Sequence, residues 1–101
     1  MKHADVIYAK GWGPIMYTGD NDEAGLKLID ENPGWIVDQR RMELGKKNAI
    51  YMHCMPADRD IEVTSEVMDG PQSVLFDEAE NRLHTIKALM ALTFGNVAGR
   101  R

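Results

Sequence analysis

The stretch at residues 49–60, AIYMHCMPADRD, constrains the possible folds of this chain most strongly. It opens with an apolar run that suits a buried β-strand. It breaks at residues 53–56, His-Cys-Met-Pro, where a proline and polar side chains end the strand. In sheets of parallel strands, ligands gather at the carboxyl ends of the strands. The stretch therefore predicts an α/β fold with a ligand site directly after this strand.

Apolar runs and helical patterns alternate along the rest of the chain. Besides the strand that opens at residue 49, short β-rich runs predict strands at residues 6–9, 35–37 and 73–76. Helices are predicted at residues 20–31, 39–44, 62–68 and 77–94, and Asp20, Asp38 and Asp77 stand at expected N-cap positions. This order predicts a partial parallel sheet with flanking helices.

The last predicted helix, residues 77–94, is apolar around most of its circumference. Apolar residues recur every three or four positions, at Ala79, Leu83, Ile86, Met90 and Phe94. Such a helix needs burial on two sides, which a chain of 101 residues can hardly supply. The chain also opens on a core strand, although parallel strands are normally joined by crossover helices. We therefore expect further elements upstream of this chain.

The composition narrows the classes of partner and site. The net charge of −4 argues against nucleic acid and anionic membranes. No apolar run approaches the roughly 18 residues of a membrane span. The one cysteine, Cys54, excludes an intramolecular disulfide and favours a reducing cytoplasm. Because adjacent His53 and Cys54 are poorly spaced to ligate one ion, no metal site is expected.

Arg82 is the most informative polar residue. It is predicted in the first turn of the last helix, where helix N-termini bind anions and an arginine strengthens a phosphate site. The alternative is an ion pair with Glu78 on the same helix face. His53 and Cys54 either face the space beside Arg82 or form a buried, hydrogen-bonded pair. A Cys–His nucleophilic pair is disfavoured, because neighbours on a strand point to opposite faces.

Three segments together carry a resemblance to a known family. Residues 53–56 resemble the His-Cys-Leu-Pro motif of the ornithine and aspartate carbamoyltransferases, and residues 69–73 (DGPQS) and 76–82 (FDEAENR) resemble that family's closing strand and helix. The resemblance covers residues 5–95, the last part of the family's amino-acid-binding domain. The family's carbamoyl-phosphate domain, with its Ser-x-Arg-Thr loop, has no counterpart, so residues 1–101 resemble part of a longer enzyme.

The resemblance implies transfer of a carbamoyl group from carbamoyl phosphate to the amine of an amino-acid or ureido-type substrate. It implies no metal or organic cofactor, and a homo-oligomer, a trimer, in which the missing N-terminal domain completes the site. By resemblance the catalytic residues are His53, Cys54 and Arg82, and the substrate-binding residues are Lys10, Trp12, Met55 and Pro56. The alternative function is a non-catalytic interaction module that docks on a partner through helix 77–94.

The choice of amine depends on residues 10–19, a loop that either packs over the core or covers a substrate. Ornithine enzymes carry Asp-x-Trp where this chain has Lys10-Gly11-Trp12, and a lysine cannot hold an α-ammonium group. The chain is closest to a knotted carbamoyltransferase branch of uncertain substrate. We expect an acylated, ureido or otherwise neutral nitrogen near Lys10, unless Lys10 is an ordinary exposed lysine or pairs with Asp58.

Overall fold

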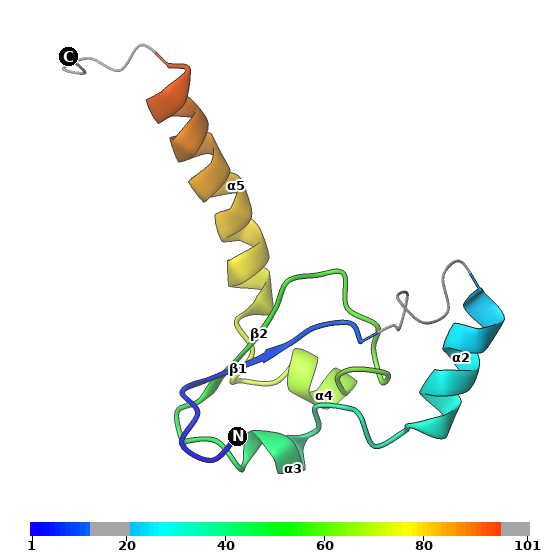
Figure 1. The fold of residues 1–101 in the computed structure, drawn as a ribbon. Coiled ribbons are helices and arrows are strands. Elements are labelled where there is room, and N and C mark those ends of the chain that lie inside the picture. The colour runs from blue at the N-terminus through cyan, green and yellow to red at the C-terminus, as the bar shows by residue number, and fades with distance from the viewer. Residues whose placement is uncertain (13–20, 96–101) are drawn as a thin grey trace.

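The computed structural model describes residues 1–12 and 21–95. The elements in chain order are β1 (Val6–Ala9), α2 (Asp22–Glu31), α3 (Gln39–Met42), β2 (Ile50–His53), α4 (Ser65–Met68) and α5 (Leu75–Thr93). Figure 1 shows β1 and β2 at the centre, with the helices around them. The described chain is therefore α/β with a small parallel sheet and flanking helices, which confirms the predicted fold class.

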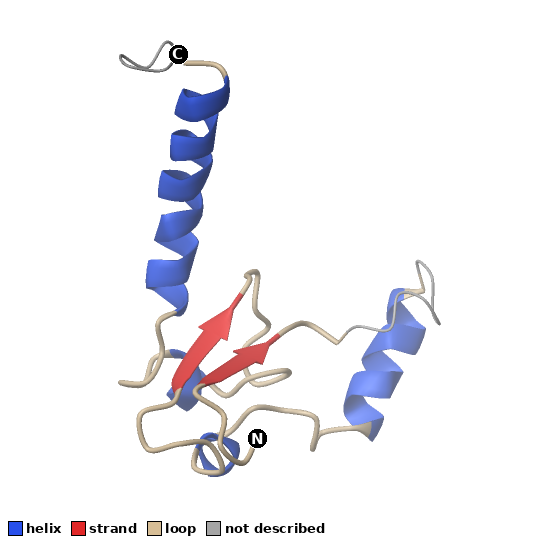
Figure 2. Ribbon diagram, turned by 60° about the vertical axis from the view of Figure 1, so that its left-hand side comes forward, coloured by secondary structure: helices blue, strands red, loops and turns tan. Residues whose placement is uncertain are grey.

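The two strands run parallel and end at the same edge. Val6 pairs with Ile50 and Ala9 pairs with His53, and Figure 2 shows both arrows pointing the same way. Alternate residues of each strand face a core shared with α3 and α4. The other face of β1 stays open, so Tyr8 is half exposed. The carboxyl ends of β1 and β2 therefore lie side by side at one edge of the sheet.

The predicted strand at residues 73–76 is wrong. Ser73 makes only an isolated parallel bridge with Tyr51, and the chain then leaves the sheet, because α5 begins at Leu75. The predicted cap at Asp77 is wrong as well, because Val74 is the N-cap and no side chain caps the helix. Arg82 is consequently the eighth residue of α5, about 10 Å along its axis, and not part of its first turn.

The other predicted elements differ mainly at their ends. Residues 35–37 reduce to a single bridge between Val37 and Val63. The N-cap at Asp38 is confirmed, since its side chain accepts a hydrogen bond from the Arg41 N–H at 2.9 Å. The short helix after Glu62 begins later than predicted, at Ser65. Asp20, the predicted cap of α2, lies outside the described residues, and Asn21 is the N-cap that the structure shows.

Two helices extend away from the core on different sides (Figures 1 and 2). α2 has no buried residue, and in α5 only Leu75 is buried. Leu83 in α5 is 66% exposed and Leu89 is 59% exposed, as expected for a helix whose apolar surface exceeds what the chain can cover. Across residues 1–12 and 21–95 no helix meets the length and hydropathy needed to cross a bilayer.

Candidate functional site

The site begins in the turn that follows β2. His53 is the last strand residue and is buried, whereas Cys54 is exposed. Met55 has a φ of 53°, in the left-handed region that few L-residues adopt, and its N–H donates to His53 Nδ1 at 2.9 Å. Pro56 follows and is exposed. The turn therefore presents Cys54 to solvent while the His53 ring stays inside.

The buried His53 ring is held by a carboxylate. Its Nε2 lies 3.0 Å from Glu62 Oε1, and Glu62 is itself buried. Because Nδ1 accepts from the Met55 N–H, the network assigns the ring proton to Nε2, which donates to Glu62. The same Glu62 oxygen accepts from the Asp58 N–H at 3.0 Å. The predicted alternative of a buried, hydrogen-bonded His-Cys pair is therefore correct for His53, which is buried, and wrong for Cys54, which is exposed.

A second carboxylate, Glu78 in the first turn of α5, connects that helix to both strands. One oxygen accepts from the Tyr8 hydroxyl at 2.8 Å, and the other accepts from the His53 backbone N–H at 3.0 Å. The hydrogen bond to Glu78, assisted by desolvation, raises the pKa of Tyr8 to about 12. Within the described ranges Glu78 is not paired with Arg82, so the predicted alternative for Arg82 is wrong.

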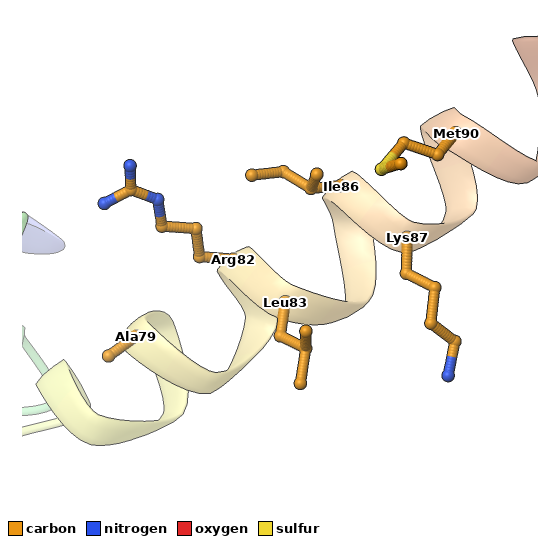
Figure 3. Close-up of a pocket in the computed structure, with 6 residues that line it drawn as sticks. All are labelled: Ala79, Arg82, Leu83, Ile86, Lys87 and Met90. Carbon is orange, nitrogen blue, oxygen red and sulfur yellow. The ribbon is translucent and has the colours of Figure 1, made fainter.

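Arg82 lies one helical turn beyond Glu78 and is exposed. It lines an open groove on α5 together with Ala79, Leu83, Ile86, Lys87 and Met90. Figure 3 shows its guanidinium extending away from the helix, beside the apolar side chain of Ile86. Arg82 therefore lies on the exposed surface of α5, away from the N-terminus of the helix.

Lys10 and Trp12 follow β1 and line a different pocket, together with Trp35, Val37, Arg41 and Glu62, among others. The rings of Trp12 and Trp35 meet edge to face, with centroids 5.2 Å apart. Lys10 is exposed, and no ion pair joins it to Asp58 among the residues that the structure describes. Of the loop at residues 10–19, positions 13–19 lie outside the described residues. Glu62 connects this pocket to the His53 ring.

Three residues of this arrangement were not predicted from the sequence as part of the site: Tyr8, Glu62 and Glu78. Their roles depend on contacts across 70, 9 and 25 residues of chain, which no local pattern encodes. Only the position of Tyr8 near the end of a predicted strand was a usable signal. Residues 1–12 and 21–95 contain no group of three or more side chains suited to hold a metal ion.

Comparisons with known proteins identify the family to which the chain is similar. The family model for the Asp/Orn-binding domain of aspartate/ornithine carbamoyltransferase matches residues 1–93. An ornithine carbamoyltransferase from Caldicellulosiruptor saccharolyticus is 50% identical over 90 residues, covering 89% of this chain and 28% of the relative. An N-acetylornithine carbamoyltransferase from Xanthomonas campestris is 45% identical over 92 residues, covering 91% of this chain and 26% of the relative.

Solved structures show the same likeness. The ornithine carbamoyltransferase of Pyrococcus furiosus superposes with a TM-score of 0.76 at 38% identity, covering 95% of this chain and 29% of that one. A variant of N-acetyl-L-ornithine transcarbamylase, complexed with carbamyl phosphate and N-succinyl-L-norvaline, gives a TM-score of 0.74 at 44% identity, covering 90% and 27%. The chain spans less than a third of the length of these relatives. It belongs to the aspartate/ornithine carbamoyltransferase family, whose Asp/Orn-binding domain model it matches over residues 1–93.

Proposed function

We propose that this chain supplies the amine-binding half of a carbamoyltransferase active site. The observation that carries the proposal is the His-Cys-Met-Pro turn at the carboxyl end of β2, which Glu78 joins to the helix that bears Arg82. The family match over residues 1–93 supports it. The carbamoyl-phosphate domain and a homo-oligomeric, trimeric assembly in the cytoplasm complete the proposal.

In the proposed reaction the neutral amine nitrogen attacks the carbamoyl carbon and forms the new C–N bond. The C–O bond to phosphate breaks, and the proton that the amine loses leaves with the phosphate. Arg82 binds an oxygen of carbamoyl phosphate, and the Met55 carbonyl accepts from the carbamoyl amino group. The exposed Cys54 lies near the incoming amine, and the buried His53 holds the turn in place. Catalysis then rests on positioning and on stabilising developing charge, without a cofactor.

The amine is bound by the pocket after β1 in this proposal. Lys10 and Trp12 line it. Pro56 lies exposed in the neighbouring turn, and Arg41, the other cation of the lining, lies 3.5 Å from an oxygen of Asp38. The exposed ammonium group of Lys10 favours a carboxylate or carbonyl oxygen and repels a free α-ammonium group. We therefore propose a substrate whose nitrogen at that end is acylated, ureido or otherwise neutral. The relatives include enzymes named for ornithine and for N-acetylornithine, so both compounds belong in the test.

The test needs a complete active site. A chimaera is built in which this chain replaces the matching residues of the Caldicellulosiruptor saccharolyticus enzyme, of which it spans 28%. Product formation from carbamoyl phosphate is measured by mass spectrometry for ornithine, N-acetylornithine, N-succinylornithine and ureido-type amines. The unmodified relative is the positive control. A chimaera that folds and assembles like its parent but carbamoylates none of these amines would contradict the proposal.

The exposed face of α5 favours a second candidate, a non-catalytic module that docks through this helix. The two functions are separated by assaying the 101-residue chain before and after mixing with the carbamoyl-phosphate domain of the relative. Carbamoyl transfer that appears on mixing supports the enzyme, whereas a stable but inactive complex supports the docking module.

A further inference from the structure

Glu78 lies where three elements meet. Its carboxylate joins the Tyr8 hydroxyl of β1, 70 residues away in sequence, and the His53 N–H of β2, 25 residues away. The carboxylate is part-buried and uses one oxygen for each contact. His53 directly precedes Cys54, and Glu78 stands one helical turn before Arg82. This one side chain therefore lies between the two parts of the site that the proposed reaction must hold together.

Just before α5 the backbone is held to β2, because the Val74 N–H donates to the Tyr51 carbonyl at 3.0 Å. Few side chains hold the first turn of the helix itself. Its N-cap, Val74, makes no side-chain hydrogen bond, and Leu75 is its one buried residue among those described. The rest of the helix projects from the core (Figure 2). Leu75 anchors one face of the first turn by burial, and Glu78 anchors another by two hydrogen bonds. Since positions four apart share a helix face, an anchor at Glu78 also sets the direction in which Arg82 extends.

We propose that Glu78 is a positioning residue, which fixes the rotation of α5 and the backbone of the His-Cys-Met-Pro turn and so sets the distance between Arg82 and Cys54. This role rests on the proposed carbamoyl transfer. It needs two hydrogen-bonding atoms at the end of a side chain of this length, and it does not need a negative charge. Glutamine therefore satisfies it: the amide oxygen accepts from the His53 N–H, and the amide nitrogen donates to the Tyr8 oxygen.

The first measurement uses the 101-residue chain as it stands. Amide hydrogen exchange at His53 is compared in wild type, Glu78→Ala, Glu78→Gln and the control Glu80→Ala, whose carboxylate contacts the exposed His84. We expect exchange at His53 to rise about tenfold in Glu78→Ala, as for loss of a charge-assisted hydrogen bond, and to stay near wild type in the other two. Exchange at the core residue Tyr51 reports any global loss of stability.

Tyrosine absorbance shows whether Glu78 acts through its negative charge or through the position of its hydrogen-bonding atoms. At pH 10 the Tyr8 phenol of the wild type stays protonated, because its pKa is raised to about 12. In Glu78→Gln the largest cause of the raised pKa is removed, so a larger fraction of Tyr8 ionises at that pH. A Tyr8→Phe chain supplies the baseline for the other tyrosines. We expect glutamine to change the Tyr8 signal while preserving protection at His53, a combination that general destabilisation does not produce.

The second measurement is kinetic, in the chimaeric carbamoyltransferase. We expect Glu78→Ala to lower kcat about 10- to 100-fold with a smaller change in the KM for the amine, and Glu78→Gln to restore most of the rate. Should Glu78→Ala match Glu80→Ala in both exchange and kcat, the positioning role is wrong. If Glu78→Gln loses as much activity and protection as Glu78→Ala, the negative charge matters and not the position of the hydrogen-bonding atoms. That result would also overturn the positioning role.

Different results would reject the positioning role of Glu78 and the proposed carbamoyl transfer on which it rests. Loss of protection at His53 in Glu78→Ala, together with an inactive wild-type chimaera, would reject the proposed function and with it the positioning role. Normal protection and rate in Glu78→Ala, with a large loss in Arg82→Lys, would reject the positioning role alone. If Glu78→Ala does not fold, Glu78→Asp replaces it in both experiments, because the shorter side chain keeps the charge but cannot reach both the Tyr8 hydroxyl and the His53 N–H.

Discussion

At the scale of single residues, Arg82 carries the sharpest prediction. Lysine at this position keeps the positive charge but loses the planar fork that binds two oxygens at once. We expect Arg82→Lys in the chimaeric enzyme to lose about 2–4 kcal/mol of transition-state stabilisation, the range seen for a lost oxyanion donor. The measurement is kcat/KM for carbamoyl phosphate. Arg40→Lys, at an exposed position on α3, is the matched control, and equal kinetics in both variants would reject the assignment.

Cys54 is predicted to line the site without forming a bond to the substrate. It is exposed beside the Tyr8–Glu78 contact, and the proposed reaction needs no covalent intermediate. We expect Cys54→Ser to lose less activity than Arg82→Lys, because serine is close in size and keeps a hydrogen-bonding group. Mass spectrometry of the enzyme quenched during turnover checks this. A carbamoyl group trapped on Cys54 would show that the direct-transfer mechanism is wrong.

Lys10 is predicted to select the amine. Losing a charge-assisted contact of this kind costs about 1.5–3 kcal/mol of binding. We expect the wild-type chimaera to prefer an acylated or ureido amine over free ornithine, and Lys10→Asp to weaken that preference by this amount. The measurement is kcat/KM across the amine panel. Preference of the wild type for free ornithine would contradict the substrate class, whereas an unchanged ranking in Lys10→Asp would leave the selection to other residues.

The residue types of the site could be predicted, but their partners could not. His53, Cys54 and Arg82 stand in recognisable local patterns, and their roles in catalysis remain predictions. The carboxylates that hold them, Glu62 and Glu78, are ordinary acidic residues in the sequence. Burial of Glu62 beside the His53 ring arises only when the turn after β2 folds back over the core, and that information is tertiary.

At the scale of elements, local pattern predicted most strands and helices, and its largest error lies where the chain crosses from sheet to helix. Residues 73–76 have strand composition, yet only Ser73 pairs with β2, and Leu75 uses its apolar side chain to anchor a helix. A short apolar run serves either purpose, so periodicity could not decide between them. The earlier start of α5 places Arg82 away from the helix N-terminus, so the two do not act together on an anion as expected, and binding of an anion by Arg82 itself stays a prediction.

The anchoring of α5 gives a prediction at this scale. Leu75 is fully buried, whereas Leu83 on the same helix is 66% exposed. We expect Leu75→Ala to lower the free energy of unfolding of the chain by about 2–5 kcal/mol, the usual cost of such a truncation in a core. Leu83→Ala should stay within about 0.5 kcal/mol, as surface substitutions do. Urea unfolding followed by circular dichroism checks both, and equal effects would mean that α5 is not anchored through Leu75.

At the scale of the whole molecule, the exposed apolar surface of α5 decides how the chain behaves alone. Leu83, Ile86, Leu89 and Met90 are each close to half exposed or more. Contiguous apolar surface of this kind marks an interaction site. We expect the 101-residue chain to be catalytically inactive, to bind a hydrophobic dye, and to self-associate. Leu83→Glu combined with Ile86→Lys should reduce both dye binding and association without lowering the stability of the core.

Analytical ultracentrifugation and dye fluorescence check this prediction, with the paired change Lys27→Glu and Glu31→Lys on α2 as a control for altered surface charge. Lys27 and Glu31 are exposed partners of one ion pair, so exchanging them leaves the net charge and the apolar surface unchanged. A wild-type chain that sediments as a monomer, binds no dye and melts in one sharp transition would contradict the prediction. The exposed apolar side chains of α5 would then be compatible with a stable monomer. The argument that another domain covers α5 would rest on the family match alone.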